Sequence, residues 1–132
     1  MFDEKSIIYE DDSLLVINKP SGILTVPTPK KEKYTLTSCL DKIFEKRSLK
    51  IKVFPCHRLD RDASGLIIYA KGLSNQKRIT EQFKNGQVKK KYIVFVSGLV
   101  KKNEGIISFP IEGKKAITKY KLMQKRRGYS II

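Results

Sequence analysis

The sequence predicts an α+β fold in which helices flank a mixed, mostly antiparallel β-sheet. Short runs of apolar residues suited to strands occur early in the chain, and they dominate it after residue 90. Between them lie two segments whose apolar residues recur at helical spacing. Strands, then helices with strands between them, then further strands are typical of α+β proteins. A length of 132 residues with 40% hydrophobic residues predicts one domain over residues 1–132.

The N-terminal part of the chain predicts two strands and a helix. An acidic turn separates apolar residues 7–9 from apolar residues 14–18, which indicates two short strands joined by a turn. Thr35 or Thr37 can cap a helix that continues to about Arg47, because apolar residues recur there every three or four positions.

The middle of the chain predicts a buried strand followed by a second helix. Residues 66–70 form a compact apolar run that indicates the strand. Ser74 is expected to cap the helix, with Ile79 and Phe83 on its inner face and Gly86 at its end.

The last third of the chain predicts strands almost throughout. Residues 91–97, 106–110 and 116–123 are the expected strands. The final letters, RRGYSII, begin an apolar alternation that indicates the start of another strand.

The charge of the chain predicts a polyanionic partner. The formal net charge is +15, and 31% of the residues are charged. Positive residues concentrate in residues 84–127, where a basic strand surface suits the phosphates of a nucleic acid. A basic chain can also lie on an anionic membrane, and edge lysines can simply prevent strands from aggregating.

The sequence also predicts where the protein is located and whether it binds a metal ion. The acidic N-terminus is unlike a targeting peptide, and no apolar run is long enough to span a membrane, so a cytoplasmic protein without membrane association is expected. Cys39 and Cys56 are not at metal-ligand spacing and His57 is the single histidine, so no metal site is expected.

The stretch HRLDRDASGLIIYAK, residues 57–71, concentrates charge immediately before an apolar strand. Asp60 lies between Arg58 and Arg61, and a carboxylate beside cations is expected to stay ionised at neutral pH. An ionised aspartate can act as a nucleophile or a base, and an arginine can clasp phosphate or stack on bases. The spacing alone equally allows a loop closed by arginine–aspartate salt bridges.

Four blocks of the sequence resemble the RluA-type pseudouridine synthases. HRLDRDASGLIIYAK resembles the family signature of His-Arg-Leu-Asp, then Thr/Ala-Ser-Gly and an apolar strand. EDDSLLVINKPSGILTVP resembles the upstream block, whereas KKKYIVFVSG and KAITKYKLM resemble two downstream strands. The resemblance covers nearly the whole chain and implies the pseudouridine synthase catalytic fold.

The resemblance assigns roles to matching residues. It implies that Asp60 is the catalytic aspartate and that Arg58 displaces the target uridine from its stack. Tyr92 is implied to pack on the uracil and to be a candidate for proton removal at its carbon 5. Lys19 and Pro20 are implied to be architectural. Ala63 stands where the family more often has threonine, which removes one possible hydrogen bond.

The implied function is isomerisation of uridine to pseudouridine in structured RNA, either rRNA or tRNA. No cofactor is expected, because nothing is oxidised or consumed. Arg58, Arg61, Lys89 and Lys90 are the expected RNA-binding residues, and a complete protein is expected to be a monomer. Whether Asp60 is a nucleophile or a base is left open by the sequence.

A non-catalytic basic RNA-binding module, or an inactive fragment of such an enzyme, is the alternative. A binding platform would expose aromatic residues among its lysines, whereas the aromatic residues of this chain are expected to point mostly inward. Family members continue beyond the last block into a Gly-Arg-Thr-His-Gln-Ile-Arg stretch. We therefore expect residues 1–132 to be the N-terminal two-thirds of a catalytic domain, inactive alone and without a separate N-terminal RNA-binding domain.

Overall fold

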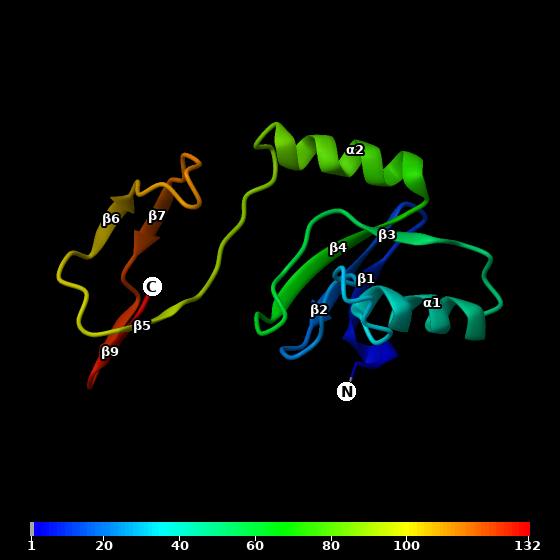
Figure 1. Cartoon of the computed structure of the whole chain (residues 1–132), viewed down its shortest axis with the longest axis horizontal. Helices are drawn as coiled ribbons and strands as arrows, with labels where there is room; N and C mark the ends of the chain where they lie inside the picture. The colour runs from blue at the N-terminus through cyan, green and yellow to red at the C-terminus, as the bar shows by residue number, and fades with distance from the viewer. Residues whose placement is uncertain (1) are drawn as a thin grey trace. The chain divides into compact units, whose positions relative to one another are not determined.

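A computed structural model describes residues 2–132 and confirms the α+β fold class. These residues form two compact units, which divide between Val88 and Lys89. Figure 1 shows both helices in the first unit and only strands and loops in the second. We call the part that ends at Val88 unit 1 and the part from Lys89 to Ile132 unit 2. The strands pair antiparallel throughout the described residues, and one isolated parallel bridge joins Leu24 to Thr35.

Unit 1 is built on a four-stranded sheet in the order β1-β2-β4-β3. Its strands are β1 (Ile7–Glu10), β2 (Leu14–Lys19), β3 (Val53–Pro55) and β4 (Gly65–Lys71). The sequence predicted β1, β2 and β4 but not β3, which is only three residues long. Strand β2 pairs with β4 along its whole length, which places Lys19 opposite Gly65. The end of β2 therefore lies beside the loop that precedes β4.

Helix α1 (Leu36–Lys46) covers one face of this sheet. Thr35 is its cap, since the hydroxyls of Thr35 and Ser38 each accept from the other residue's backbone N–H. Its apolar face, centred on Leu40 and Phe44, is buried with β2 and β4 in the main core. A preceding turn of 3-10 helix, η1 (Glu4–Ser6), leads into β1.

Helix α2 (Leu73–Lys84) packs against β4 and β3. The prediction that Ser74 caps it is wrong, because Gly72 occupies the cap position and Ser74 lies within the first turn. Gly72 has a φ of 83°, a left-handed conformation that suits glycine and turns the chain directly from β4 into the helix. The inward placement of Ile79 and the helix end before Gly86 are confirmed.

Unit 2 consists of two small sheets. A three-stranded sheet has the order β5-β9-β8, formed by β5 (Phe95–Ser97), β8 (Gln124–Arg126) and β9 (Tyr129–Ile131). A two-stranded sheet pairs β6 (Glu104–Ile107) with β7 (Thr118–Lys121). The strand expected in RRGYSII is confirmed as β9.

The strands of unit 2 are shorter than predicted, because strand length follows the available partner. Pairing along the first strand begins only at Val94, whose N–H and C=O bond to Ile132. The predicted strand over residues 116–123 is divided, since Leu122 donates its N–H to Asn103 whereas Met123 donates to Ile131. The β6–β7 pairing ends at Ile107 and Thr118, short of Pro110, which has no N–H to donate.

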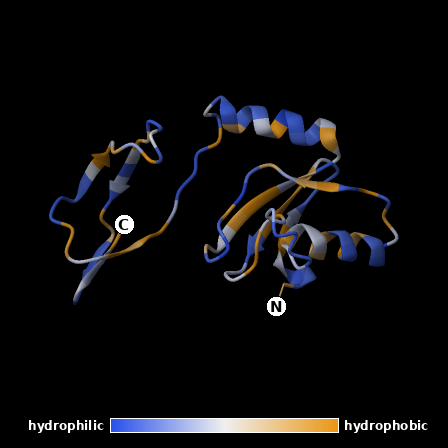
Figure 2. Cartoon of the chain, in the orientation of Figure 1, coloured by the Kyte–Doolittle hydropathy of each residue, from blue (hydrophilic) through white to orange (hydrophobic). Residues whose placement is uncertain are grey.

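The expectation that the aromatic residues point mostly inward is wrong for unit 2. Tyr69 in unit 1 is fully buried, but Tyr92, Phe95 and Phe109 are 59%, 68% and 81% exposed. Figure 2 shows short hydrophobic stretches of unit 2 alternating with hydrophilic ones. Unit 2 therefore exposes aromatic side chains in a lysine-rich part of the chain, which is the feature expected of a surface on which bases stack.

An ion-pair network joins the end of α1 to the sheet of unit 1. Arg47 donates to both Glu4 and Glu10, and Lys71 lies 2.8 Å from the second oxygen of Glu10. Burial disfavours the Glu10 carboxylate, but the hydrogen bonds from Lys71 and Arg47 outweigh it and lower its pKa. The charged form of Glu10 therefore stabilises unit 1.

We predict that Glu10→Gln lowers the free energy of unfolding by about 2 kcal/mol at pH 7, because two cations lose a charged acceptor. The contribution is fully present above the unfolded pKa, near 4.5, and is lost as the pH falls through the lower folded pKa. The free energies of urea unfolding of the variant and the original chain should therefore approach each other as the pH falls below 4.5 and converge below the folded pKa, with the exposed Asp12→Asn as a matched control. An unchanged difference between pH 7 and pH 3 would contradict this prediction.

Candidate active site

The predicted catalytic aspartate lies on the loop of residues 56–64, which connects β3 to β4. We call residues 57–63 the Asp60 loop. Leu59 points into the main core and is 8% exposed, whereas Arg58, Asp60 and Arg61 are exposed. The loop thus fixes one apolar residue inside the protein and presents charged side chains on either side of it.

The ammonium of Lys19 holds the carbonyl groups of this loop. Lys19 is fully buried at the end of β2, and its Nζ donates to the carbonyls of Pro20, Arg61 and Ala63 at 3.0, 3.0 and 2.8 Å. A lysine ammonium has three N–H donors, so all of them are used. Burial lowers the pKa of Lys19, while the charges of Asp62 and Asp60 oppose that shift.

The residues after Lys19 add further contacts to the Asp60 loop. Ser21 donates its hydroxyl to the carbonyl of Asp62 at 2.8 Å, and Gly22 donates its N–H to the carbonyl of Arg61 at 2.8 Å. Gly22 has a φ of 88°, so a side chain at this position would be strained. The Asn-Lys-Pro-Ser-Gly block and the Asp60 loop are therefore bonded directly to each other, although about forty residues separate them in the chain.

His57 orients the start of the loop. Its Nε2 accepts the backbone N–H of Ile68 at 3.1 Å, next to the bond from the Cys56 N–H to the Ile68 carbonyl. The imidazole thereby takes the place of a backbone acceptor where the chain leaves β3. Its ring also packs 4.7 Å from the ring of Phe83 on α2.

The arginines flanking Asp60 do not close the loop by pairing with it. Arg61 lies 3.8 Å from Glu32, and no ion pair joins the Asp60 carboxylate to Arg58 or Arg61 within residues 2–132. A loop closed by arginine–aspartate salt bridges is thus not what the structure forms. The loop is held through contacts to its backbone, so its exposed charged side chains can reach a ligand. The carboxylate can act as an acid–base or nucleophilic group, and the guanidinium groups can bind phosphate.

The remaining predicted site residues belong to unit 2. Tyr92, Lys89 and Lys90 are exposed and lie on the segment that precedes β5. Arg58, Asp60 and Arg61 share one loop in unit 1, so the structure brings these three residues together. The three residues of unit 2 are not part of that loop.

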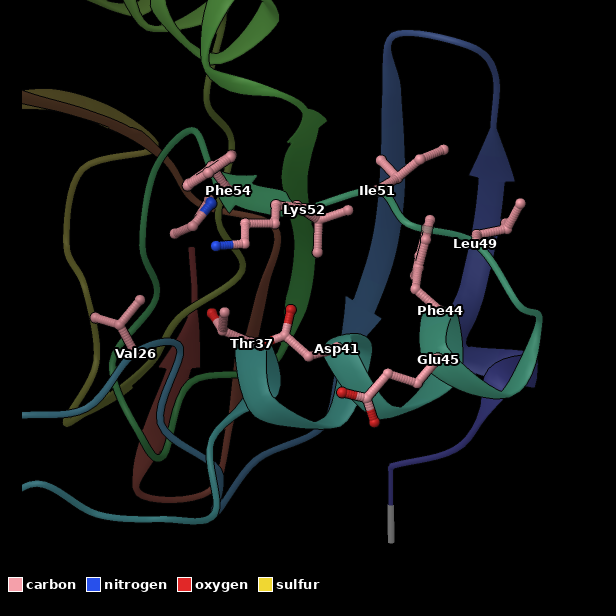
Figure 3. A pocket seen from close by; sticks show the side chains of 11 residues that line it. Val26, Thr37, Asp41, Phe44, Glu45, Leu49, Ile51, Lys52 and Phe54 are labelled. Carbon is pink, nitrogen blue, oxygen red and sulfur yellow. The ribbon is translucent and has the colours of Figure 1, made fainter.

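A separate groove of about 580 Å³ lies in unit 1 between α1 and residues 49–55. Figure 3 shows Thr37 and Asp41 on neighbouring turns of α1, on the side that faces Lys52 and Phe54. Burial, followed by the charge of Glu45, raises the pKa of Asp41. None of the predicted site residues lines this groove.

Two general features of the described chain bear on the kind of site. Across residues 2–132, no helix is long and apolar enough to cross a membrane. The same residues contain no group of three or more histidine, cysteine, aspartate or glutamate side chains arranged to hold a metal ion.

Sequence reasoning identified the charged residues of the loop but missed two that hold it. Thr25 contacts Leu59 and Ser21 contacts Asp62, and each contact links positions more than thirty residues apart. A signal was present for the burial of Lys19, because the alternation of β2 places it on the same face as buried Leu15 and Ile17.

Comparison with curated proteins gives a consistent set of relatives. Ribosomal large subunit pseudouridine synthase D of Borreliella burgdorferi is 35% identical, over 96% of this chain and 45% of its own length. An uncharacterized RNA pseudouridine synthase of Zymomonas mobilis is 31% identical, over 97% and 64%. The mitochondrial tRNA pseudouridine(32) synthase of Saccharomyces cerevisiae is 38% identical, over 80% and 22%. The chain spans about half the length of the curated relatives it matches.

Solved structures and a family model agree with these relatives. The fold is similar to that of human RNA pseudouridylate synthase domain containing 4, with a TM-score of 0.80 and 21% identity over 96% of this chain and 57% of that one. A model of the family described as RNA pseudouridylate synthase matches residues 13–131, which include the Asp60 loop, its Lys19 anchor and most of unit 2. The resemblance predicted from the four sequence blocks is thereby confirmed, and the chain belongs to the RNA pseudouridylate synthase family.

Proposed function

We propose that the protein is an RNA pseudouridine synthase in which Asp60 is the catalytic carboxylate. The observation that carries the proposal is the Asp60 loop itself, whose backbone is bound by buried Lys19 while the carboxylate is exposed. A carboxylate on a rigid backbone meets the need of an enzyme for a group at a fixed position. Asp60 acts either as a nucleophile or as a base, and both roles use its ionised form.

The reaction conserves all atoms of the nucleotide. The bond between the uracil nitrogen and the ribose breaks, and carbon 5 of the uracil forms the new bond to the same ribose carbon. The proton displaced from carbon 5 passes to a base and then to water, while the freed nitrogen takes up a proton. No oxidant, reductant or second substrate enters this balance.

The target uridine has to leave the base stack before an exposed loop can act on it. Unstacking costs a few kcal/mol, and the enzyme offsets that cost with contacts to the displaced base and to the gap that it leaves. The planar guanidinium of Arg58, two residues from Asp60, is suited to fill that gap by stacking. Tyr92 is proposed to pack on the uracil and to take part in proton removal at its carbon 5.

Structured RNA is the proposed substrate, with rRNA and tRNA as the two candidate classes. The relatives include a ribosomal large subunit enzyme and a tRNA enzyme, which supports both classes. Arg58, Arg61, Lys89 and Lys90 are proposed to bind its phosphates, which agrees with a net charge of +15. We further propose that the protein acts in the cytoplasm as a monomer.

A non-catalytic RNA-binding module remains a second candidate, because one observation favours it. Exposed Tyr92, Phe95 and Phe109 lie among the lysines of unit 2, as they would on a stacking platform. The two candidates differ in whether Asp60 matters for turnover.

We predict that Asp60→Asn lowers pseudouridine formation by about 1,000-fold or more, because it removes the proposed acid–base or nucleophilic group. The affinity for RNA should change by less than about threefold, since the substitution is exposed and nearly isosteric. Tritium release from RNA labelled at carbon 5 of uridine measures turnover, and filter binding measures affinity, both in the full-length protein.

Asp62→Asn is the matched control, because Asp62 is also an exposed aspartate on the same loop. It should retain most of the activity of the unmodified protein. Turnover near the original rate in Asp60→Asn would refute the catalytic proposal. Full RNA binding by a protein that never forms pseudouridine in any cellular RNA would favour the binding module.

We predict that RNA affinity falls steeply with salt and that Lys89→Glu with Lys90→Glu weakens it about tenfold for every RNA sequence tested. Lysines that contact phosphates release counterions, so the double variant should also flatten the salt dependence by one to two units of slope, about 0.9 per phosphate. Lys42→Glu with Lys77→Glu carries the same change in charge on the helices of unit 1 and is the control. Equal weakening by both pairs would show a net-charge effect and contradict a defined binding site at Lys89 and Lys90.

A further inference from the structure

Thr25 is a buried polar residue in contact with the Asp60 loop. It lies on the segment after Gly22 and is 2% exposed, with apolar Ile23 buried two residues before it. A hydroxyl in such a place is costly unless it is hydrogen-bonded. The partners of this hydroxyl therefore indicate why a threonine stands there.

The Thr25 hydroxyl binds both polar groups of one backbone residue. Its Oγ1 donates to the carbonyl of Leu59 at 2.9 Å and accepts the N–H of Leu59 at 3.3 Å. The pair resembles one step of a strand ladder, with a side chain in place of the second backbone. Because two bonds of opposite direction hold Leu59, they restrain both its position and the rotation of its peptide groups.

Thr25 is itself attached to rigid elements. Its carbonyl lies 2.9 Å from the Thr37 hydroxyl and 3.2 Å from the Thr37 N–H, at the first turn of α1. The hydroxyl of Tyr69, a buried residue of β4, lies 3.2 Å from the same carbonyl. The backbone of Thr25, whose hydroxyl binds Leu59, is thus held by helix α1 and by strand β4 of the central sheet.

The two sides of Asp60 are held by different residues. Lys19 binds the carbonyls of Arg61 and Ala63, which follow Asp60, whereas Thr25 binds Leu59, which immediately precedes it. Removal of either anchor would free one end of the short segment that carries the carboxylate. The Lys19 contacts do not reach the preceding peptide group, which is held by the Thr25 hydroxyl together with the burial of the Leu59 side chain in the core.

We propose that Thr25 is a positioning residue, which fixes the peptide group before Asp60 and thereby the direction of the Asp60 carboxylate toward the reacting nucleotide. The inference rests on the proposed function of Asp60. Thr25 touches neither RNA nor reacting atoms in this account, and it acts only through Leu59. Its loss should therefore slow the chemical step and leave RNA binding nearly unchanged.

Thr25→Val is the informative substitution, because valine keeps the shape and removes the hydroxyl. Thr35→Val is the matched control, since Thr35 is also a buried threonine, 1% exposed, whose hydroxyl accepts the Ser38 N–H at the start of α1 rather than contacting Thr25 or residues 57–63. Thr25→Ser restores a hydroxyl and tests rescue. If Thr25→Val does not fold, Thr25→Cys replaces it, because a thiol is only a weak hydrogen-bond donor.

Two measurements on the full-length protein decide the matter. The first is amide hydrogen exchange at Leu59, which should be about tenfold faster or more in Thr25→Val than in Thr35→Val. The second is the single-turnover rate at saturating RNA, which should fall about 10- to 100-fold in Thr25→Val, the scale of a misplaced catalytic group. RNA affinity should stay within about twofold, and Thr25→Ser should recover most of the rate.

The outcomes separate this inference from the proposed function. Leu59 exchange that is equal in Thr25→Val and Thr35→Val would overturn the inference, as would faster exchange with an unchanged turnover rate. If the unmodified protein forms no pseudouridine, the proposed function fails and the catalytic role of Thr25 fails with it. The exchange at Leu59 would still show whether Thr25 anchors the loop.

Discussion

The arrangement of the candidate site depends on one buried ammonium group. Lys19 uses all three of its N–H donors on backbone carbonyls, two of which belong to the Asp60 loop. Burying a charge is costly, and the cost is met only while these carbonyls converge on it. The loop must therefore turn its carbonyls inward, which leaves Arg58, Asp60 and Arg61 directed outward. The acidic charges of Asp60 and Asp62 in turn favour the charged form of the lysine.

Much of unit 1 could be predicted from the sequence, because its elements follow local patterns. Helical spacing located α1, and short apolar runs located β2 and β4. The alternation along β2 also implies the inward direction of Lys19, because Leu15 and Ile17 lie on the same face. The contacts between Thr25 and Leu59 and between Arg61 and Glu32 could not be predicted in this way. Each is a tertiary contact between segments that are distant in the sequence, and the periodicity of a single sequence does not indicate such contacts.

Unit 2 departs further from the sequence-based picture, and the reason is also physical. Its strands end where their partners end, so the long apolar runs were poor guides to strand length. Ser130 is the single buried residue among residues 89–132, where it binds the Val100 N–H and the Gly98 carbonyl. Exposed aromatic rings beside lysines are suited to bases and phosphates. The proposed RNA partner of this surface was thus expected from the family resemblance. The exposure of its aromatic residues was not expected from the sequence pattern, which predicted that they point mostly inward.

The central claim is that contacts from residues 19–25, and above all the Lys19 ammonium, hold the Asp60 loop in place. Native-state hydrogen exchange at the Gly22 amide, which binds the Arg61 carbonyl, tests it most directly. The comparison is Lys19→Met against Lys71→Met, another poorly exposed lysine whose partner is Glu10 rather than the loop. The account predicts that Gly22 exchanges about tenfold faster or more in Lys19→Met alone, with the amides of α1 still protected. Equal protection of Gly22 in the two variants would contradict it.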